Sequence, residues 1–188
     1  MRSVDEYLRE YIEEYMQEVH VPKLIVALLA AWYFFGIAFT KTEWHFIDNI
    51  NLIFHEAGHT LFMFFGHFLY VLGGSLFQVV FPLVFVGYFF LRREFFSSSL
   101  LFFWVGQNLI NVSVYAGDAV KMQLDLLGGD GGDTSGHDWH NIFEMLGLLQ
   151  YTDAISAAIY TAGILVMLAA TGWAILTARK TAPVRSEW

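Results

Sequence analysis

The chain has 188 residues, of which 56% are hydrophobic, 18% aromatic and only 15% charged. An ordinary soluble domain carries about 25% charged residues, so this balance favours a membrane protein with a single domain. The formal net charge of -8 argues against a nucleic-acid partner. Because the chain has no cysteine, disulfides, thiolate metal sites and cysteine nucleophiles are excluded.

The first 20 residues are rich in acidic and aromatic side chains and predict an amphipathic surface helix. Leu8, Tyr11, Ile12, Tyr15 and Met16 recur at helical spacing. No basic run leads into a short apolar core and a small-residue cleavage site, so we expect no cleavable signal peptide.

Five apolar stretches follow, and a helix needs about 20 apolar residues to cross a bilayer. The stretches lie near 22–40, 46–72, 75–91, 95–119 and 152–178. We interpret Gly73-Gly74 as the break between the second and third stretches, and a glycine-rich loop at 120–141 as the link between the last two. The sequence therefore predicts an all-α, polytopic integral membrane bundle of about five transmembrane helices over residues 21–179, with a C-terminal tail at 180–188.

Lysine and arginine residues indicate the orientation, because cytoplasmic loops carry an excess of them. An outside N-terminus assigns Lys41, Arg92, Arg93 and Arg179 to the cytoplasm, although Lys23 argues against it. We expect the N-terminus outside and the C-terminus inside, in a bacterial or archaeal inner (plasma) membrane.

The second stretch contains the motif His55-Glu56-Ala57-Gly58-His59. His55 and His59 are four residues apart, so both imidazoles lie on one helix face and can bind one metal ion. Glu56 points about 100° away and can act on a metal-bound water, which is the logic of H-E-x-x-H. Asn51 lies one turn before His55 and can orient it. The alternative is a hydrogen-bonded histidine pair that ties helices together.

The fourth stretch carries a polar stripe. Gln107, Asn111, Tyr115 and Asp118 follow at intervals of four, four and three residues and share one helix face, with Asn108 beside it. Polar groups in hydrocarbon need partners. A role at the site and simple hydrogen bonding between helices both stay open, while Asp118 is the more suggestive residue because a carboxylate is a good third zinc ligand.

The segment after the glycine-rich loop offers further ligands, His137, Asp138 and His140, although Asp138 can also cap a helix that starts there. If the second and fourth stretches run parallel, Asp118 lies roughly 12 Å beyond His59. The third ligand then comes from the 137–140 segment dipping inward, or the site is split. His67 is another candidate.

The run Phe54–His59, together with the polar later stretch, resembles the site-2 protease group of intramembrane zinc metalloproteases. The resemblance implies that the two histidines of the motif bind zinc and that its glutamate activates water. It also implies that Asp118 completes the site and that Asn108 or Asn111 contacts the substrate.

We therefore expect a membrane-embedded zinc-dependent metallohydrolase, an intramembrane peptidase that acts on a transmembrane or membrane-adjacent peptide. One alternative is an iron-dependent membrane oxidoreductase, because imidazole and carboxylate suit iron as well as zinc. Its iron ligands would come from His55, His59, His67, Asp118, His137 and His140. The other alternative is a non-catalytic accessory subunit of a larger membrane complex, in which the polar stripes serve assembly.

Overall fold

The structure is a computed structural model that describes residues 19–124 and 136–179, together with Val4, Glu6 and Leu8. Most of the surface helix expected over residues 1–20 and the tail at 180–188 lie outside the described residues. So do residues 125–135 of the glycine-rich loop.

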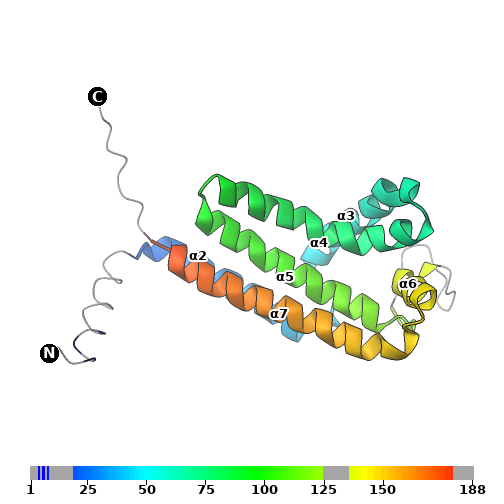
Figure 1. Cartoon of the computed structure of the whole chain (residues 1–188). Coiled ribbons are helices and arrows are strands. Elements are labelled where there is room, and N and C mark those ends of the chain that lie inside the picture. The colour runs from blue at the N-terminus through cyan, green and yellow to red at the C-terminus, as the bar shows by residue number, and fades with distance from the viewer. Residues whose placement is uncertain (1–3, 5, 7, 9–18, 125–135, 180–188) are drawn as a thin grey trace.

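Within the described residues the chain is all-helical, as the sequence predicts (Figure 1). The long helices are α2 (Val21–Phe39), α3 (Phe46–Phe62), α4 (His67–Leu91), α5 (Phe95–Gly117) and α7 (Thr152–Thr177). The shorter elements are α6 (Asp138–Leu146) and the 3₁₀ turns η1 (Met63–Phe65) and η3 (Leu149–Tyr151).

Four helical segments are long and apolar enough to cross a membrane, namely α2, α4, α5 and the continuous segment Leu149–Thr177. They fit an integral membrane protein. The helix that carries the histidine motif, α3, is not among them: it has 17 residues, and its buried residues include Asp48, Asn51 and His55. The described residues therefore provide four candidate spans rather than five.

The expected break at Gly73-Gly74 is wrong, and with it the boundary between the stretches at 46–72 and 75–91. The chain turns instead at Gly66, where φ is 92° and favours glycine, and α4 then continues unbroken through both glycines. A Cβ on Gly58 of α3 would collide with the carbonyl oxygen of Gly73, and one on Gly73 would lie 2.9 Å from the carbonyl oxygen of Gly58. The glycines of α4 therefore permit close helix contact rather than a turn.

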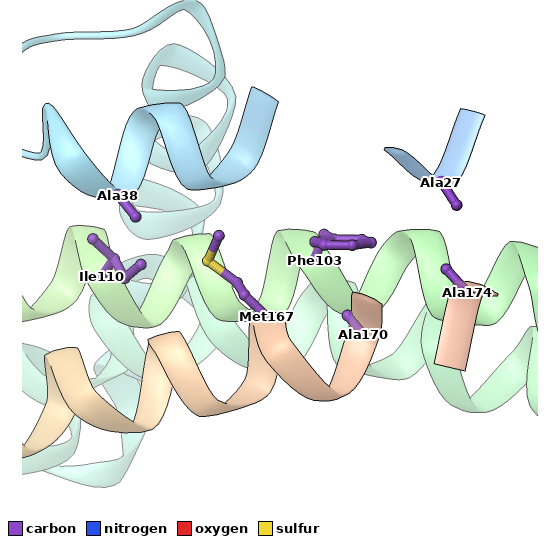
Figure 2. Packing of buried hydrophobic residues seen from close by; sticks show 7 residues of the cluster. All are labelled: Ala27, Ala38, Phe103, Ile110, Met167, Ala170 and Ala174. Carbon is purple, nitrogen blue, oxygen red and sulfur yellow. The ribbon is translucent and has the colours of Figure 1, made fainter. Parts of the chain in front are cut away.

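The other half of the bundle is an apolar seam between α2, α5 and α7 (Figure 2). Its buried residues are Ala27, Ala38, Phe103, Ile110, Met167, Ala170 and Ala174. Gly106 of α5 and Gly163 of α7 bring two backbones together, because a Cβ on Gly163 would lie 2.8 Å from the carbonyl oxygen of Gly106. The seam holds the long helices side by side and leaves α3 and α6 to pack on α4.

The start of α2 and the end of α7 lie at the same end of the bundle. Val19 and Arg179 form an antiparallel bridge, and the His20 N–H donates to the Ala178 carbonyl at 2.9 Å. The expected outside N-terminus and inside C-terminus do not fit this arrangement, because the two ends of the described bundle lie side by side. The α6 helix lies at the opposite end (Figure 1).

Candidate metal centre

Three potential ligand atoms meet between α3 and the first turn of α6. Asp138 Oδ2 lies 2.9 Å from His55 Nε2 and 3.1 Å from His59 Nε2, and the two Nε2 atoms are 3.1 Å apart. Tetrahedral nitrogen and oxygen ligands around zinc are about 3.3–3.4 Å from one another. Small outward shifts would therefore let these atoms hold one metal ion.

Both histidines present the ring nitrogen that a metal needs. His59 Nδ1 lies 2.8 Å from the Tyr70 carbonyl oxygen, and His55 Nδ1 lies 3.2 Å from Gln78 Oε1. Since these oxygens accept, each Nδ1 carries a proton and donates it. In a neutral imidazole the Nε2 lone pair is then free for a metal, and this outer hydrogen bond also fixes the orientation of the ring.

Gly74 of α4 keeps the space beside the two rings open. A Cβ at this position would lie 2.6 Å from His55 Nε2 and 2.6 Å from His59 Nε2. Any larger residue would therefore crowd the atoms that would bind a metal. The space and the donor set both fit a metal ion of the zinc or iron type.

Asp138 reaches the histidines because α6 is anchored on two long helices. The Asp138 backbone N–H donates to Tyr115 Oη of α5 at 2.9 Å. On the next residue, Trp139 Nε1 donates to Ser75 Oγ of α4 at 3.0 Å. These two contacts hold the first turn of α6 over the histidine motif.

Asp118 does not belong to this three-atom group. Its carboxylate accepts hydrogen bonds from the Gln123 and Leu124 N–H groups, at 2.9 Å and 3.0 Å, and lies 3.4 Å from His137 Nε2. It thus organises the turn after α5 and the start of α6. The structure brings Asp138 rather than Asp118 to the two histidines, because the segment at 137–140, the alternative source of a third ligand, comes down to them from the end of the bundle.

The electrostatics of this segment favour a charged aspartate and a neutral capping histidine. Burial alone would raise the pKa of Asp138, but the hydrogen bonds and charges of His55 and His59 in their protonated, metal-free form outweigh it and lower that pKa below its ordinary value. Burial lowers the pKa of His137, although Asp118 opposes the shift. Neutral His137 Nδ1 can then accept the His140 N–H at 3.2 Å and cap α6.

A cavity of about 820 Å³ lies beside the three ligand atoms. Glu56 lines it and is exposed, and Tyr115 lines it from α5. His67 and Asn111 are also in its wall, as is the segment Lys41–Trp44 that follows α2. The cavity therefore brings a base, a hydroxyl group and the candidate ligands into one space.

The remaining residues singled out from the sequence divide into two groups. Asn51, Gln107 and Asn111 form buried hydrogen bonds between α3 and α5, described below. Asn108 is buried and donates to the Trp104 carbonyl, and His140 pairs with the Ala119 carbonyl at 2.8 Å, so neither faces the three ligand atoms.

Two residues that matter at this site escaped sequence reasoning as site residues, Gly74 and Gln78. Gln78 had a usable signal, because an amide inside an apolar helix must find a hydrogen-bond partner. Gly74 had no such signal, because the sequence alone cannot distinguish a glycine that leaves room for an imidazole ring from one that ends a helix.

No family model matches this chain, and no match was found among the curated proteins or the solved structures. Function must therefore be inferred from the site itself.

Proposed function

We propose that this chain is a membrane-embedded zinc-dependent hydrolase, with a peptide as its substrate. The observation that carries the proposal is the group of His55 Nε2, His59 Nε2 and Asp138 Oδ2, with no pair more than 3.1 Å apart. Two histidines and one carboxylate with a further position open to water are typical of catalytic zinc. Bound zinc would lower the pKa of a coordinated water toward about 7.

Glu56 would transfer protons during hydrolysis, and Tyr115 would donate a hydrogen bond to the substrate. Glu56 follows the first ligand on α3 and lines the cavity, so its carboxylate can accept a proton from the attacking water and pass it to the leaving amine. Tyr115 Oη already accepts the Asp138 N–H, which leaves its own O–H free to donate to the substrate carbonyl oxygen. Together they would balance the charge that develops as the peptide bond breaks.

The choice of a peptide rests on the likeness of Phe54–His59 to the site-2 protease motif. The cavity also favours a bond near the membrane surface, because Lys41 and Glu43 line it and follow directly after α2, a candidate span. A membrane-anchored peptide, cleaved where it leaves the bilayer, fits this position.

The cations favour an orientation. Lys23, Arg92, Arg93 and Arg179 belong to the end of the bundle where α2 begins and α4 and α7 end. By the positive-inside rule this end faces the cytoplasm and the site faces the outside. A bacterial or archaeal plasma membrane remains our proposal for the host membrane.

The same donor set supports one other candidate. Two histidines and a carboxylate also hold iron in non-haem oxygenases. Zinc is favoured because Glu56, a base beside the ligand pair, has a role in hydrolysis and none in simple oxygen activation.

The test begins with metal content. We expect the protein, purified in detergent without added metal, to carry about one zinc per chain by mass spectrometry, and His59→Ala to lose it. Iron in place of zinc would overturn the hydrolase in favour of the oxygenase. Folded protein that neither carries zinc nor takes it up would leave the accessory-subunit hypothesis.

Glu56→Gln separates binding from chemistry. We expect this variant to keep its zinc and to lose about 10²- to 10⁴-fold in the rate of peptide cleavage, the range for a general base. The readout is cleavage of a peptide library in detergent or liposomes. Glu43→Gln is the matched control, since it neutralises another carboxylate of the cavity wall. Unchanged cleavage in Glu56→Gln would contradict the proposed role.

A further inference from the structure

One buried carboxylate lies away from the three candidate ligand atoms but is linked by a chain of hydrogen bonds to one of their residues, His55. Asp48, in the first turn of α3, is 4% exposed. Its Oδ2 accepts the His45 N–H at 2.8 Å. Its Oδ1 accepts from Gln107 Nε2 at 2.9 Å and from Asn111 Nδ2 at 3.1 Å. These hydrogen bonds all require Asp48 to accept.

One chain of hydrogen bonds runs from Asp48 to the histidine motif, and the carboxylate fixes its direction. Because Asp48 accepts, Asn111 must turn its NH₂ group toward it and its oxygen toward Gln78. Gln78 Nε2 then donates to Asn111 Oδ1 at 2.8 Å, which leaves Gln78 Oε1 facing His55 Nδ1 at 3.2 Å. His55 must therefore carry a proton on Nδ1.

A second chain reaches Asp48 from another side and requires the same polarity. The Trp104 indole can only donate, and its Nε1 does so to Asn51 Oδ1 at 2.8 Å. Asn51 Nδ2 then donates to Gln107 Oε1 at 2.8 Å, so Gln107 Nε2 must donate to Asp48. Two independent chains thus end on the same oxygen, Asp48 Oδ1.

The two histidines differ in what fixes their protons. His59 pairs with the Tyr70 backbone carbonyl, which has no other way to face it. His55 pairs with the Gln78 amide, which could present either its oxygen or its NH₂ group. The orientation of the Gln78 amide must therefore be set by its other hydrogen-bond partners, and that chain of amides ends on Asp48.

We infer that Asp48 is a positioning residue that sets, through Asn111 and Gln78, which ring nitrogen of His55 carries the proton and so keeps Nε2 free for the metal. The inference rests on the proposed metal site. It gives the polar stripe of α5 a role beyond joining two helices. Through Asn111 of this stripe, Asp48 fixes which end of the Gln78 amide faces His55.

Asp48→Asn tests this with almost no change of shape. With its oxygen kept toward the His45 N–H, the new residue places its NH₂ group where Oδ1 was, and that group faces the donors of Asn111 and Gln107. Asn111 and Gln78 can turn over, and Gln78 then presents NH₂ to His55 Nδ1. Gln107 is held by Asn51 and Trp104 and simply loses its hydrogen bond to residue 48. The His55 proton moves to Nε2 and points at the other two ligand atoms.

Two measurements follow. In the metal-free protein, ¹⁵N-histidine NMR reports directly whether Nδ1 carries a proton, and we expect His55 to have a proton on Nδ1 in the wild type and only on Nε2 in Asp48→Asn. Zinc affinity, measured by competition with a chelating dye, should fall about 10- to 100-fold, the effect expected of groups behind a metal ligand.

Two further variants distinguish an effect of hydrogen-bond direction from a general disruption of the structure around the site. Trp104→Phe disrupts the second chain and leaves Asn51 without its donor, but we expect wild-type tautomer and zinc affinity. Adding Gln78→Glu to Asp48→Asn supplies a carboxylate that can only accept from His55, and it should restore both readouts.

The inference is overturned if Asp48→Asn keeps the Nδ1–H tautomer, or if its affinity falls no further than that of Trp104→Phe. It also fails if Gln78→Glu restores nothing in folded protein. The tautomer is read without metal or activity, so a chain that binds no zinc would defeat the proposed function and still leave the role of Asp48 measurable.

Discussion

The polar end of the molecule and the apolar seam are built on opposite principles. In the seam of α2, α5 and α7, residues such as Phe103 and Met167 are fully buried and are held by shape alone. Around the histidine motif, side chains are held by the direction of each hydrogen bond, as in the chain from Asp48 to His55. Changes of volume should therefore damage the seam, and changes of polarity or ligand space should damage the site.

Among changes that leave the three candidate ligands in place, Gly74→Ala should produce the largest effect at the site. The new Cβ would lie 2.6 Å from both Nε2 atoms, and the rings cannot retreat without losing their bonds to Gln78 and Tyr70. We expect zinc affinity to fall more than about 1,000-fold, or about 4 kcal/mol, by competition titration. Gly87→Ala is the matched control, because its Cβ would meet nothing within 4 Å and should leave affinity unchanged. Normal zinc binding by Gly74→Ala would contradict the site geometry.

Met167→Ala should lower the stability of the protein and leave its zinc affinity unchanged. It removes a fully buried side chain from the seam and leaves a cavity, which costs about 2–3 kcal/mol in stability. Thermal denaturation in detergent should show the loss, while zinc affinity of the folded protein stays at the wild-type value. A parallel loss of affinity would mean that the two regions are coupled and would weaken the comparison.

Asp118→Ala should have the smallest effect. Asp118 supports the turn after α5 and the start of α6 but lies outside the three ligand atoms, so one zinc should still bind. We expect an affinity lower by about tenfold or less, about 1.4 kcal/mol. Asp138→Ala, measured beside it, should abolish binding. If the two variants exchanged these results, Asp118 would be the ligand, as the resemblance implies.

The sequence reveals the class of fold and the motif because both depend on local pattern. Long apolar runs predict membrane helices, and two histidines four residues apart share a face wherever their helix lies. The number of spans could not be read in this way. The stretch at 46–72 contains enough apolar residues to cross, but its polar face and the turn at Gly66 divide it.

The sequence leaves the third candidate ligand open between Asp118 and the segment at 137–140, because the choice depends on tertiary packing. Asp118 and Asp138 are both carboxylates near a helix end, and only the contacts of α6 with Tyr115 and Ser75 decide between them. The glycines of α4 pose the same problem. Nothing in the sequence separates a glycine that turns the chain from one that faces an imidazole.

The assembly of the site from distant segments has a consequence for biosynthesis. His55 and Asp138 are 83 positions apart, and α4 and α5 lie between them. At a synthesis rate of about 5–20 residues per second, the histidine pair precedes its carboxylate by roughly 4 to 17 seconds. During that interval the nascent chain offers two of the three candidate ligands. In the proposed hydrolase, tight metal loading would therefore have to wait until α6 has been made and has docked, and the growing chain would pass through the insertion machinery in an inactive form.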